Sequence, residues 1–518
     1  MDLDPLPLKR NVDDDNLIDT TSLDQEIDRL LSSSDEELDQ ISYQPPDIKI
    51  PHDDNIHHVM LPDDTTLPPL PPFSLKKLWK FTGPGFLMSV AFLDPGNLEG
   101  DLQAGAVSGY SLLWLLLWST AMGLLIQLLS CRIGVVTGRH MAEICRDEYP
   151  YWAILFLWFM AEIALIAADI QEVIGSAIAI KILSNGGVPL WCGVLITAFD
   201  CFIFLFLENY GVRKLEAVFA GFISIMALSF AWMFADTNPN GKELLLGLLI
   251  PKVGSKTIQK AVGLLGGIMT PHNIFLYSAV VQSRKVDVKK KGQVQEALYY
   301  YTIESSIAVF VTFTINLFVT TIFAKGFYNT KEADNIGLLN AGHFLEERYG
   351  DGLFPILYIW GIGLLAAGQS STLTGTYAGQ FIMGGFLDLP MRKWLRTLIT
   401  RSCAIVPTII IAVWFNRSED SLDVLNQWLN VLQGLQIPFA LIPLLKLVSS
   451  ERLMGPFKIK PTMKMISWLV AGLVITVNGC VLMEVFISKV KGFMVGFLVS
   501  FVNTVYVAFI WYLISREA

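Results

Sequence analysis

The chain contains 518 residues, of which 53% are hydrophobic and only 16% are charged. Soluble domains carry about 25% charged residues, so this composition, with a mean hydropathy of +0.49, excludes an ordinary soluble enzyme. The net charge of −9 is unevenly distributed, because residues 1–72 have a balance of −14 and the other 446 residues a balance of +5. A body this weakly basic argues against a nucleic-acid partner.

Residues 1–72 form an acidic segment with few aromatic residues, many Asp and Ser residues and a proline-rich end. This composition cannot bury enough apolar surface to offset the entropy of an ordered chain, so we expect a disordered cytosolic tail. Within it, Glu26, Leu30 and Leu31 resemble an acidic dileucine sorting signal, which would bind a trafficking adaptor and favour a vacuolar (tonoplast) or other endomembrane location. The alternative is a chance pair of leucines, which leaves the plasma membrane open as the location.

From residue 73 onward, apolar runs of about 20 residues alternate with short polar loops, and about 20 apolar residues suffice for one helix to cross the bilayer. The pattern predicts an all-α membrane protein with twelve transmembrane spans embedded in lipid. The expected spans are residues 78–106, 111–135, 152–183, 188–207, 215–236, 258–283, 299–325, 352–385, 394–414, 424–447, 464–487 and 492–515.

Basic residues gather in the loops after the even-numbered spans, as at Arg139, Arg213, Arg284 and Lys393. Because short cytoplasmic loops carry an excess of Lys and Arg, we expect both termini in the cytosol. Twelve spans leave no separate soluble domain for catalysis, and the sequence shows neither a nucleophile–base constellation nor a close Cys/His cluster. We therefore expect no enzyme and no resident cofactor.

Two of the expected spans are interrupted at mid-depth by helix-breaking residues. The first contains DPGN at residues 94–97, and the sixth contains GGIMTPHN at residues 266–273. Proline and paired glycines free backbone carbonyls from the helical ladder, and such breaks in matching places of two halves point to a transporter's binding site. The breaks open two sets of five spans, which predicts an inverted repeat of five plus five. The implied regions are a core at 73–447, with repeats at about 73–236 and 258–447, and spans 11 and 12 at 448–518.

The break in the first span carries a carboxylate at Asp94 and a neutral oxygen at Asn97. A carboxylate inside a membrane is costly and is by default functional. Together with freed carbonyls, these groups predict an oxygen-rich pocket for a cation. The alternative is that Asp94 caps the second half-helix, a role that does not exclude metal binding.

These breaks resemble those of the NRAMP family of divalent-metal transporters, and the similarity extends over residues 73–518. Further matching motifs are ENYGVRK at 208–214, AGQSST at 367–372 and QIPFA at 436–440, with plant vacuolar members the most similar. The resemblance implies a LeuT-like fold, alternating access, and movement of Mn²⁺ or Fe²⁺ into the cytosol, often with protons. By motif position it makes Asp94 and Asn97 metal ligands. It adds the carbonyl of Ala91 and puts Gly267 where a small residue turns its carbonyl to the metal.

The sequence departs from the family at Thr270, where a methionine normally offers its sulfur to the metal. Soft thioether ligands select transition metals, whereas hydroxyl, carbonyl and carboxylate oxygens suit Mg²⁺. Gly267, in a place usually held by Ala or Cys, is expected to leave room for a partly hydrated ion, as Mg²⁺ prefers. The pairing of Gly267 and Thr270 resembles the NRAMP-related magnesium transporters, so we expect transport of Mg²⁺ and possible transport of Mn²⁺.

Several alternatives stay open at this stage. Threonine here also occurs in related plant aluminium transporters, which makes Al³⁺ a competitor. Met269 could rotate into the site, or Thr270 could cap a half-helix while Asp94 still binds Mn²⁺ in a conventional Mn²⁺/Fe²⁺ carrier. The substitution could also abolish transport. The remaining rival is a non-transporting signalling protein with an NRAMP-like body, for which we would expect a long soluble extension beyond the body, whereas this chain stops at residue 518.

Intramembrane acids also occur in the third span, where Glu162, Asp169 and Glu172 fall near one helical face. Such a row is typical of a proton relay or a salt-bridge network. The resemblance places these acids, His272 and a ninth-span arginine, Arg401 or Arg396, in a proton pathway, so we expect proton coupling. On the tenth span, Asn430 could complete the shell of a hard ion, although membrane amides more often hydrogen-bond between helices.

Overall fold

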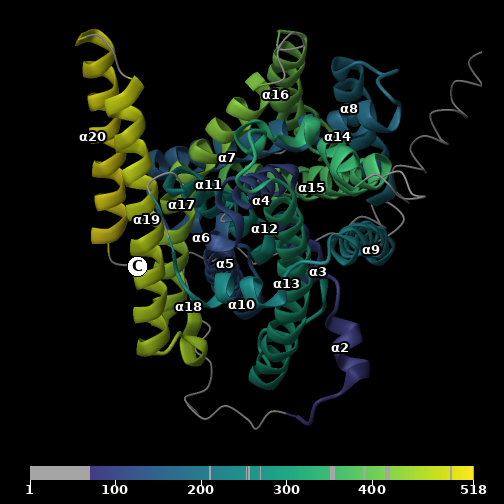
Figure 1. Cartoon of the computed structure of the whole chain (residues 1–518). Coiled ribbons are helices and arrows are strands. Elements are labelled where there is room, and N and C mark those ends of the chain that lie inside the picture. Colours follow the sequence, from purple (N-terminus) through teal and green to yellow (C-terminus); the bar gives the residue numbers. More distant parts are fainter. Residues whose placement is uncertain are drawn as a thin grey trace, which may run out of the picture. The chain divides into compact units, whose positions relative to one another are not determined.

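The computed structural model describes residues 71–516, apart from 209–211, 253, 255–256, 269, 350–355, 389–392, 415–419 and 490–492. The acidic tail and its residues Glu26, Leu30 and Leu31 lie outside the described residues. Throughout the described part the secondary structure is helical, with no β-strand (Figure 1).

The helices of the first half follow the apolar runs closely. The first expected span is broken into α3 (Pro84–Ser89), the short turn η1 (Val90–Phe92) and α4 (Pro95–Ser108). The next four are α5 (Leu113–Thr137), α7 (Tyr151–Leu183), α8 (Leu190–Glu208) and α9 (Val212–Thr237).

The second half repeats this order and then continues. The sixth span is broken into α11 (Ile258–Ile268) and α12 (Pro271–Val280). The others are α13 (Lys291–Phe327), α15 (Ile356–Leu387), α16 (Lys393–Trp414), α17 (Asp420–Ser449), α19 (Pro461–Lys489) and α20 (Phe493–Ser515). Within the described residues, seven helical stretches are long and apolar enough to cross a membrane, and two shorter apolar helices accompany them.

The structure adds short helices that the apolar runs do not reveal, because each is too short or too polar to resemble a span. They are α2 (Leu75–Phe81), α6 (Met141–Glu148), α10 (Gly241–Leu249), α14 (Leu338–Tyr349) and α18 (Glu451–Met454). Span 7 also begins eight residues earlier than predicted, at Lys291 rather than 299, since its first two turns are polar.

Close packing of the helices depends on small residues, as in other membrane bundles. On α15, a Cβ added to Gly368 would lie 2.1 Å from Ser176 Oγ of α7. On α5, a Cβ added to Gly134 would lie 2.1 Å from the backbone oxygen of Ser278 in α12. These approaches fix the broken sixth span against α5 and bring α7 and α15 into contact along their length.

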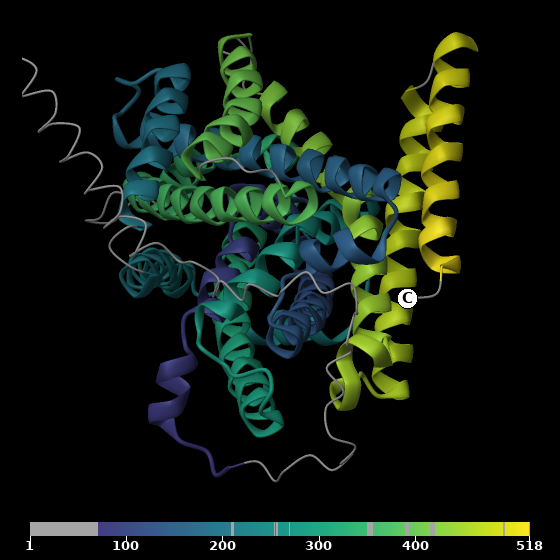
Figure 2. The same cartoon turned by 180° about the vertical axis from the view of Figure 1, so that it is seen from behind.

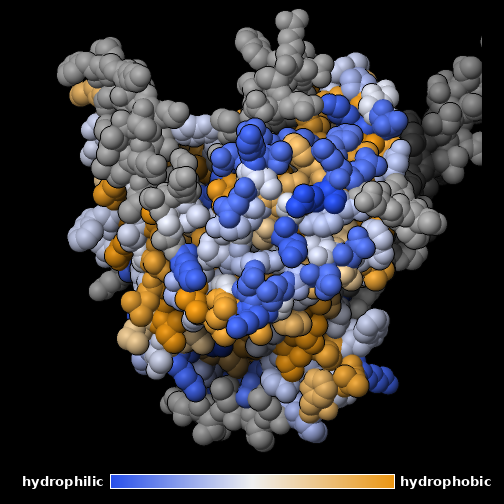
Figure 3. Space-filling model, in the orientation of Figure 1, coloured by the Kyte–Doolittle hydropathy of each residue, from blue (hydrophilic) through white to orange (hydrophobic). Residues whose placement is uncertain are grey.

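At one edge of the body, α19 and α20 run side by side (Figures 1 and 2). Their surfaces carry large exposed apolar side chains, among them Leu469, Phe497, Phe501 and Trp511. Apolar patches are also visible on the face drawn in Figure 3. In a protein with these spans such surfaces are suited to contact with lipid rather than water.

Contacts from distant parts of the sequence define one side of the body. The backbone N–H of Ser74 donates to the Tyr300 hydroxyl at 3.0 Å, and Arg284 Nη2 donates to the carbonyl of Thr82 at 2.8 Å. The start of α2 therefore contacts α13, and the end of α2 contacts the segment that follows α12. We call this region the N-terminal side.

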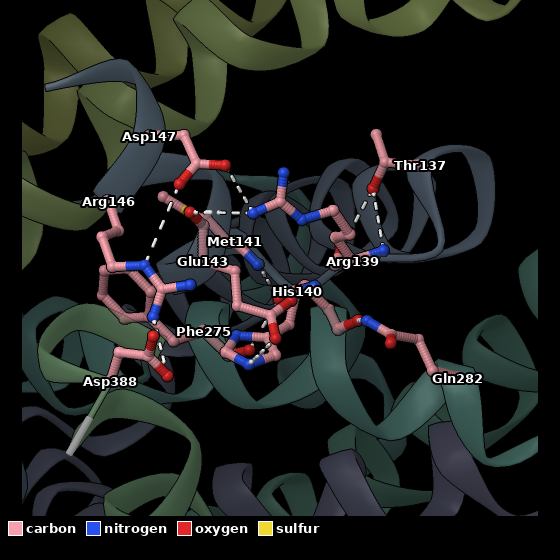
Figure 4. A network of polar contacts seen from close by, with 11 residues as sticks. Thr137, Arg139, His140, Met141, Glu143, Arg146, Asp147, Phe275, Gln282 and Asp388 are labelled. Carbon is pink, nitrogen blue, oxygen red and sulfur yellow. Dashed lines mark hydrogen bonds and ion pairs between the residues drawn. The ribbon is translucent and has the colours of Figure 1, made fainter. Parts of the chain in front are cut away.

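Helix α6 connects three spans by polar contacts (Figure 4). The backbone N–H of Met141 donates to Ser278 Oγ of α12 at 2.9 Å. Arg146 lies 3.4 Å from Asp388, the residue that follows α15. Since α6 itself follows α5, it joins the ends of α5, α12 and α15.

The N-terminus of α6 is a capping box formed by His140 and Glu143. Glu143 Oε2 accepts a hydrogen bond from the His140 backbone at 3.0 Å. Burial raises the pKa of Glu143, but hydrogen bonds from His140 and the charge of Arg139 outweigh burial, so the pKa is lower than usual. The ionised carboxylate therefore stabilises the start of α6.

Candidate metal centre

The break in the first span is built around Asp94, which is 4% exposed. Asp94 is the N-cap of α4, and its Oδ1 accepts a hydrogen bond from the backbone N–H of Asn97 at 2.6 Å. Pro95, at the first helical position, has no N–H to satisfy. The capping role considered from the sequence is therefore present. It leaves acceptor capacity, because a carboxylate offers about four lone-pair sites.

Asn97 connects the two broken spans. Its Nδ2 donates to the carbonyl of Ala91 at 3.2 Å, which ties the two halves of the first span together. A Cβ added to Gly267 would lie only 2.4 Å from Asn97 Oδ1. The structure thus brings together Asp94, Asn97, Ala91 and Gly267, four of the residues expected at the metal.

The close approach changes the interpretation of Gly267. From the sequence, its missing side chain was expected to leave room for water around the ion. In the structure that space is occupied by Asn97 Oδ1, so the glycine admits the side-chain oxygen of a residue that is predicted to bind the metal. Space for water lies elsewhere, in the cavity described next.

Thr270 is the N-cap residue of α12 by position, but its side chain makes no capping hydrogen bond within the described residues. Its hydroxyl accepts a hydrogen bond from Asn273 Nδ2 at 2.5 Å. Thr270 and Ala91 both line a cavity of about 40 Å³ that also borders Met88 and Gln127. A volume above about 10–15 Å³ suffices for a water molecule, so the cavity can hold an ion or its water. Met269, the alternative sulfur ligand, lies outside the described residues.

Two amide groups at this cavity were not singled out from the sequence. Among the residues that the structure describes, the side-chain oxygen and nitrogen of buried Gln127 lack hydrogen-bond partners, as does the Oδ1 atom of Asn273. Buried polar atoms are normally satisfied, so these groups are available to a hydrated ion. A glutamine within an apolar span is the sequence signal that could have found Gln127.

Asn430 takes part in a network of amides between helices. Gln171 Nε2 of α7 donates to Asn430 Oδ1 at 2.8 Å, and Gln433 Nε2 donates to Gln171 Oε1 at 2.6 Å. A Cβ added to Gly96 would lie 2.8 Å from Gln171 Oε1. Gln171, which was missed from the sequence, therefore links the first, third and tenth spans beside the break. The interhelical role expected as the alternative for Asn430 is present.

Four of the expected proton-pathway groups are buried. Glu162, Asp169 and Glu172 lie inside the body on α7, and His272 follows Pro271 at the start of α12. His272 Nδ1 has no hydrogen-bond partner in the described part of the protein. The side chains of Arg401 and Arg396 in α16 lie outside that part. Proton transfer through these groups stays a prediction.

The donor set is dominated by oxygen. In the described part of the chain, no group of three or more His, Cys, Asp or Glu residues could hold a metal ion. The centre and its cavity present the carboxylate of Asp94 with amide, carbonyl and hydroxyl oxygens, and one thioether, that of Met88, borders the cavity. Such ligands suit a hard divalent cation better than a soft one.

Comparison with known proteins identifies the family. The family model described as "Natural resistance-associated macrophage protein-like" (Nramp) matches residues 85–484. The chain belongs to the Nramp family. It is 71% identical to "Metal transporter Nramp2" of Populus trichocarpa over 447 residues, which cover 86% of this chain and 83% of the relative. It is also 71% identical to "Metal transporter Nramp3" of Arabidopsis thaliana over 446 residues, with 86% and 88% covered.

Solved structures show that the Nramp chain has the expected fold. A mutant of the Eremococcus coleocola manganese transporter matches with a TM-score of 0.76 and 27% identity, covering 87% of this chain and 96% of that one. Mhp1, a nucleobase-cation-symport-1 family transporter, matches with a TM-score of 0.53 and 13% identity over 83% and 92% of the two chains, a likeness of fold alone. The predicted all-α, LeuT-like fold with broken helices is confirmed.

Proposed function

We propose that this Nramp protein is a secondary transporter that moves divalent metal cations into the cytosol by alternating access, with Mg²⁺ as the preferred ion and Mn²⁺ as a second substrate. The carrying observation is the buried centre where Asp94 and Asn97 meet Gly267, beside the Thr270 hydroxyl. Similarity to the plant metal transporters and to the E. coleocola manganese transporter supports metal transport in general. The ion is the cargo of this site rather than a resident cofactor.

The preference for Mg²⁺ is supported by the chemistry at Thr270. A hydroxyl has two lone pairs, and the hydrogen bond from Asn273 uses one of them. The other can face a cation or its water. Mg²⁺ gives up its waters reluctantly and usually keeps several, and the adjoining cavity of about 40 Å³, with the unsatisfied amides of Gln127 and Asn273, can hold them.

Flux into proteoliposomes tests the choice of ion. Wild type should take up Mg²⁺, and Thr270→Met should weaken Mg²⁺ uptake and favour Mn²⁺, because it adds a soft ligand. Thr270→Ser keeps the hydroxyl and serves as the matched control, which should resemble wild type. The preference for Mg²⁺ is wrong if wild type moves Mn²⁺ and is indifferent to Mg²⁺. Asp94→Ala should abolish transport of either ion, and normal flux would remove the proposed site.

A Mn²⁺/Fe²⁺ carrier is the second candidate, favoured by the structural match to a manganese transporter. It predicts Mn²⁺ flux that excess Mg²⁺ does not inhibit. Al³⁺ added to the same assay distinguishes an aluminium carrier, and absence of flux for every ion would favour a non-transporting signalling role.

Proton coupling and orientation complete the proposal. We propose that protons accompany the metal through Glu162, Asp169, Glu172 and His272, which are all buried. Acidification inside the vesicle during uptake tests this, and a constant internal pH would assign the acids to structure.

We propose that the protein lies in an endomembrane, the tonoplast above all, with its N-terminal side facing the cytosol. Protease access to a tag at residue 1 in intact vacuoles tests that orientation.

A further inference from the structure

Two half-helices form part of the walls of the cavity beside the metal centre. Met88 of α3 lines one part of it, and Asn273 and Ile274 of α12 line another. Both half-helices run from the centre to the N-terminal side. Their positions therefore decide whether the cavity connects with that side, so the contacts that hold them matter for transport.

Glu304 of α13 holds the start of α3. It is 1% exposed, and its Oε1 accepts hydrogen bonds from the backbone N–H groups of Gly83 at 2.5 Å and Gly85 at 3.0 Å. Pro84, between them, has no N–H. The first N–H groups of a helix have no partner within the helix, and the Glu304 oxygen supplies an acceptor for two backbone N–H groups at this start.

The glycines beside Glu304 suit this contact. Gly83 has φ 138°, a conformation that other residues rarely adopt, and a Cβ added to Gly85 would lie 3.0 Å from Glu304 Cδ. A side chain at Gly85 would press on the carboxylate. The sequence at this turn is therefore fitted to bring the backbone against Glu304.

The neighbouring residue holds the other half-helix. Ser305 Oγ lies 2.5 Å from the hydroxyl of Tyr277 in α12, and both residues are buried. One turn earlier on α13, the Tyr301 hydroxyl donates to the carbonyl of Val281, just after α12, at 2.8 Å. One stretch of α13 thus contacts both half-helices that line the cavity.

We propose that Glu304 and Ser305 form a clamp that couples α3 to α12 and keeps the cavity closed toward the N-terminal side, with Glu304 a positioning residue for transport. Neither residue lines the cavity. The clamp acts on the ion through the half-helices. The proposal rests on the proposed transport function. It identifies the contact that must loosen, in the transport cycle, before the ion is released to the N-terminal side.

Labelling of a cysteine in the cavity wall tests the clamp without requiring transport. The Met88→Cys protein would be placed in proteoliposomes of known orientation. The protein with Met88 unchanged measures the labelling of the chain's own cysteines, which is the background. A membrane-impermeant thiol reagent would then be added from the N-terminal side. Glu304→Ala removes the acceptor of two backbone N–H groups, so it should raise the labelling rate about tenfold or more, the equivalent of about 1.4 kcal/mol. Glu304→Gln keeps an acceptor oxygen and should have a smaller effect.

Two further arms keep the test decisive if Glu304→Ala fails to fold. Tyr277→Phe removes only the hydroxyl that contacts Ser305, and it should raise the labelling in the same direction. Calorimetric binding of Mg²⁺ should give the wild-type Kd in Glu304→Ala and Tyr277→Phe, whereas the maximal flux falls with KM unchanged. Wild-type labelling in both Glu304→Ala and Tyr277→Phe would overturn the clamp, and so would a Kd that weakens together with the flux. Absence of flux in the wild type would instead count against the proposed function.

Discussion

Substitution of Gly267 by alanine separates metal binding from stability. The added Cβ would lie 2.4 Å from Asn97 Oδ1, whereas ordinary contacts begin near 3.4 Å, so this oxygen must retreat by about 1 Å. The obstacle is the end of a side chain rather than backbone. The expected cost in folding stability is therefore no more than the Asn97 hydrogen bond to Ala91, about 1 kcal/mol.

The effect on the ion should be larger and should depend on its identity. Mg²⁺ demands near-ideal octahedral geometry at about 2.0–2.1 Å, so displacement of one ligand oxygen should weaken Mg²⁺ binding about tenfold or more, the equivalent of about 1.4 kcal/mol. Mn²⁺ should lose less, because the resemblance described above implies a larger residue at this position in transporters of Mn²⁺.

Titration calorimetry of the detergent-solubilised protein, with a thermal unfolding curve for each variant, measures both quantities. The matched control is Gly263→Ala on the same helix, where an added Cβ has nothing within 4 Å among the described residues. That control should leave both affinities unchanged and should raise the stability slightly, since alanine favours a helix. Wild-type Mg²⁺ affinity in Gly267→Ala would refute the placement of Asn97 Oδ1 at the ion.

Three further outcomes follow from contacts outside the ligand set. Gln171→Ala removes the amide that hydrogen-bonds to Asn430 and Gln433, and it should lower the free energy of unfolding by about 2 kcal/mol. Thermal unfolding in detergent measures this change. An unchanged midpoint would contradict a stabilising role for the hydrogen bonds of Gln171. Gly134→Ala meets backbone rather than a side chain, so it should cost about 1–3 kcal/mol and reduce flux, while Gly472→Ala, which has nothing within 4 Å in the described part of the chain, should do neither. The pKa of Glu143 is lowered, so its stabilising effect is present above the usual pKa of about 4.3 and is lost as pH falls below it. Wild type should unfold at a higher temperature than Glu143→Gln, and this difference should shrink below that pH. A difference that grows on acidification would show that the pKa shift of Glu143 has the opposite direction.

Much of the fold could be predicted because one property, the length of the apolar runs, determines where the membrane helices lie. A membrane helix needs a long apolar run, and each run from the broken first span to α20 became a helix or a broken pair. Proline and glycine in the segments at 94–97 and 266–273 marked the breaks, since these residues interrupt a helix wherever they occur. Short helices such as α6 were missed because neither length nor apolarity distinguishes them from loops.

The candidate site was predictable only where a single residue carries the signal. Asp94 is conspicuous because a membrane carboxylate is costly. Glu304 offered the same signal within span 7 and was overlooked. Gln171 and Gly267 gain their importance from partners far away in the sequence, and only the folded structure shows which side chain occupies the space beside a glycine.

Asp94 caps α4 and is also predicted to bind the ion. These two roles affect the step in which a carrier returns without its cargo. After release, an uncompensated carboxylate within the bilayer would hold the empty protein back, because a bare charge there is unfavourable. Here the backbone N–H of Asn97 already contacts that carboxylate at 2.6 Å. The start of α4 therefore offsets part of this charge, which lowers the cost of the empty state without a contribution from the cargo.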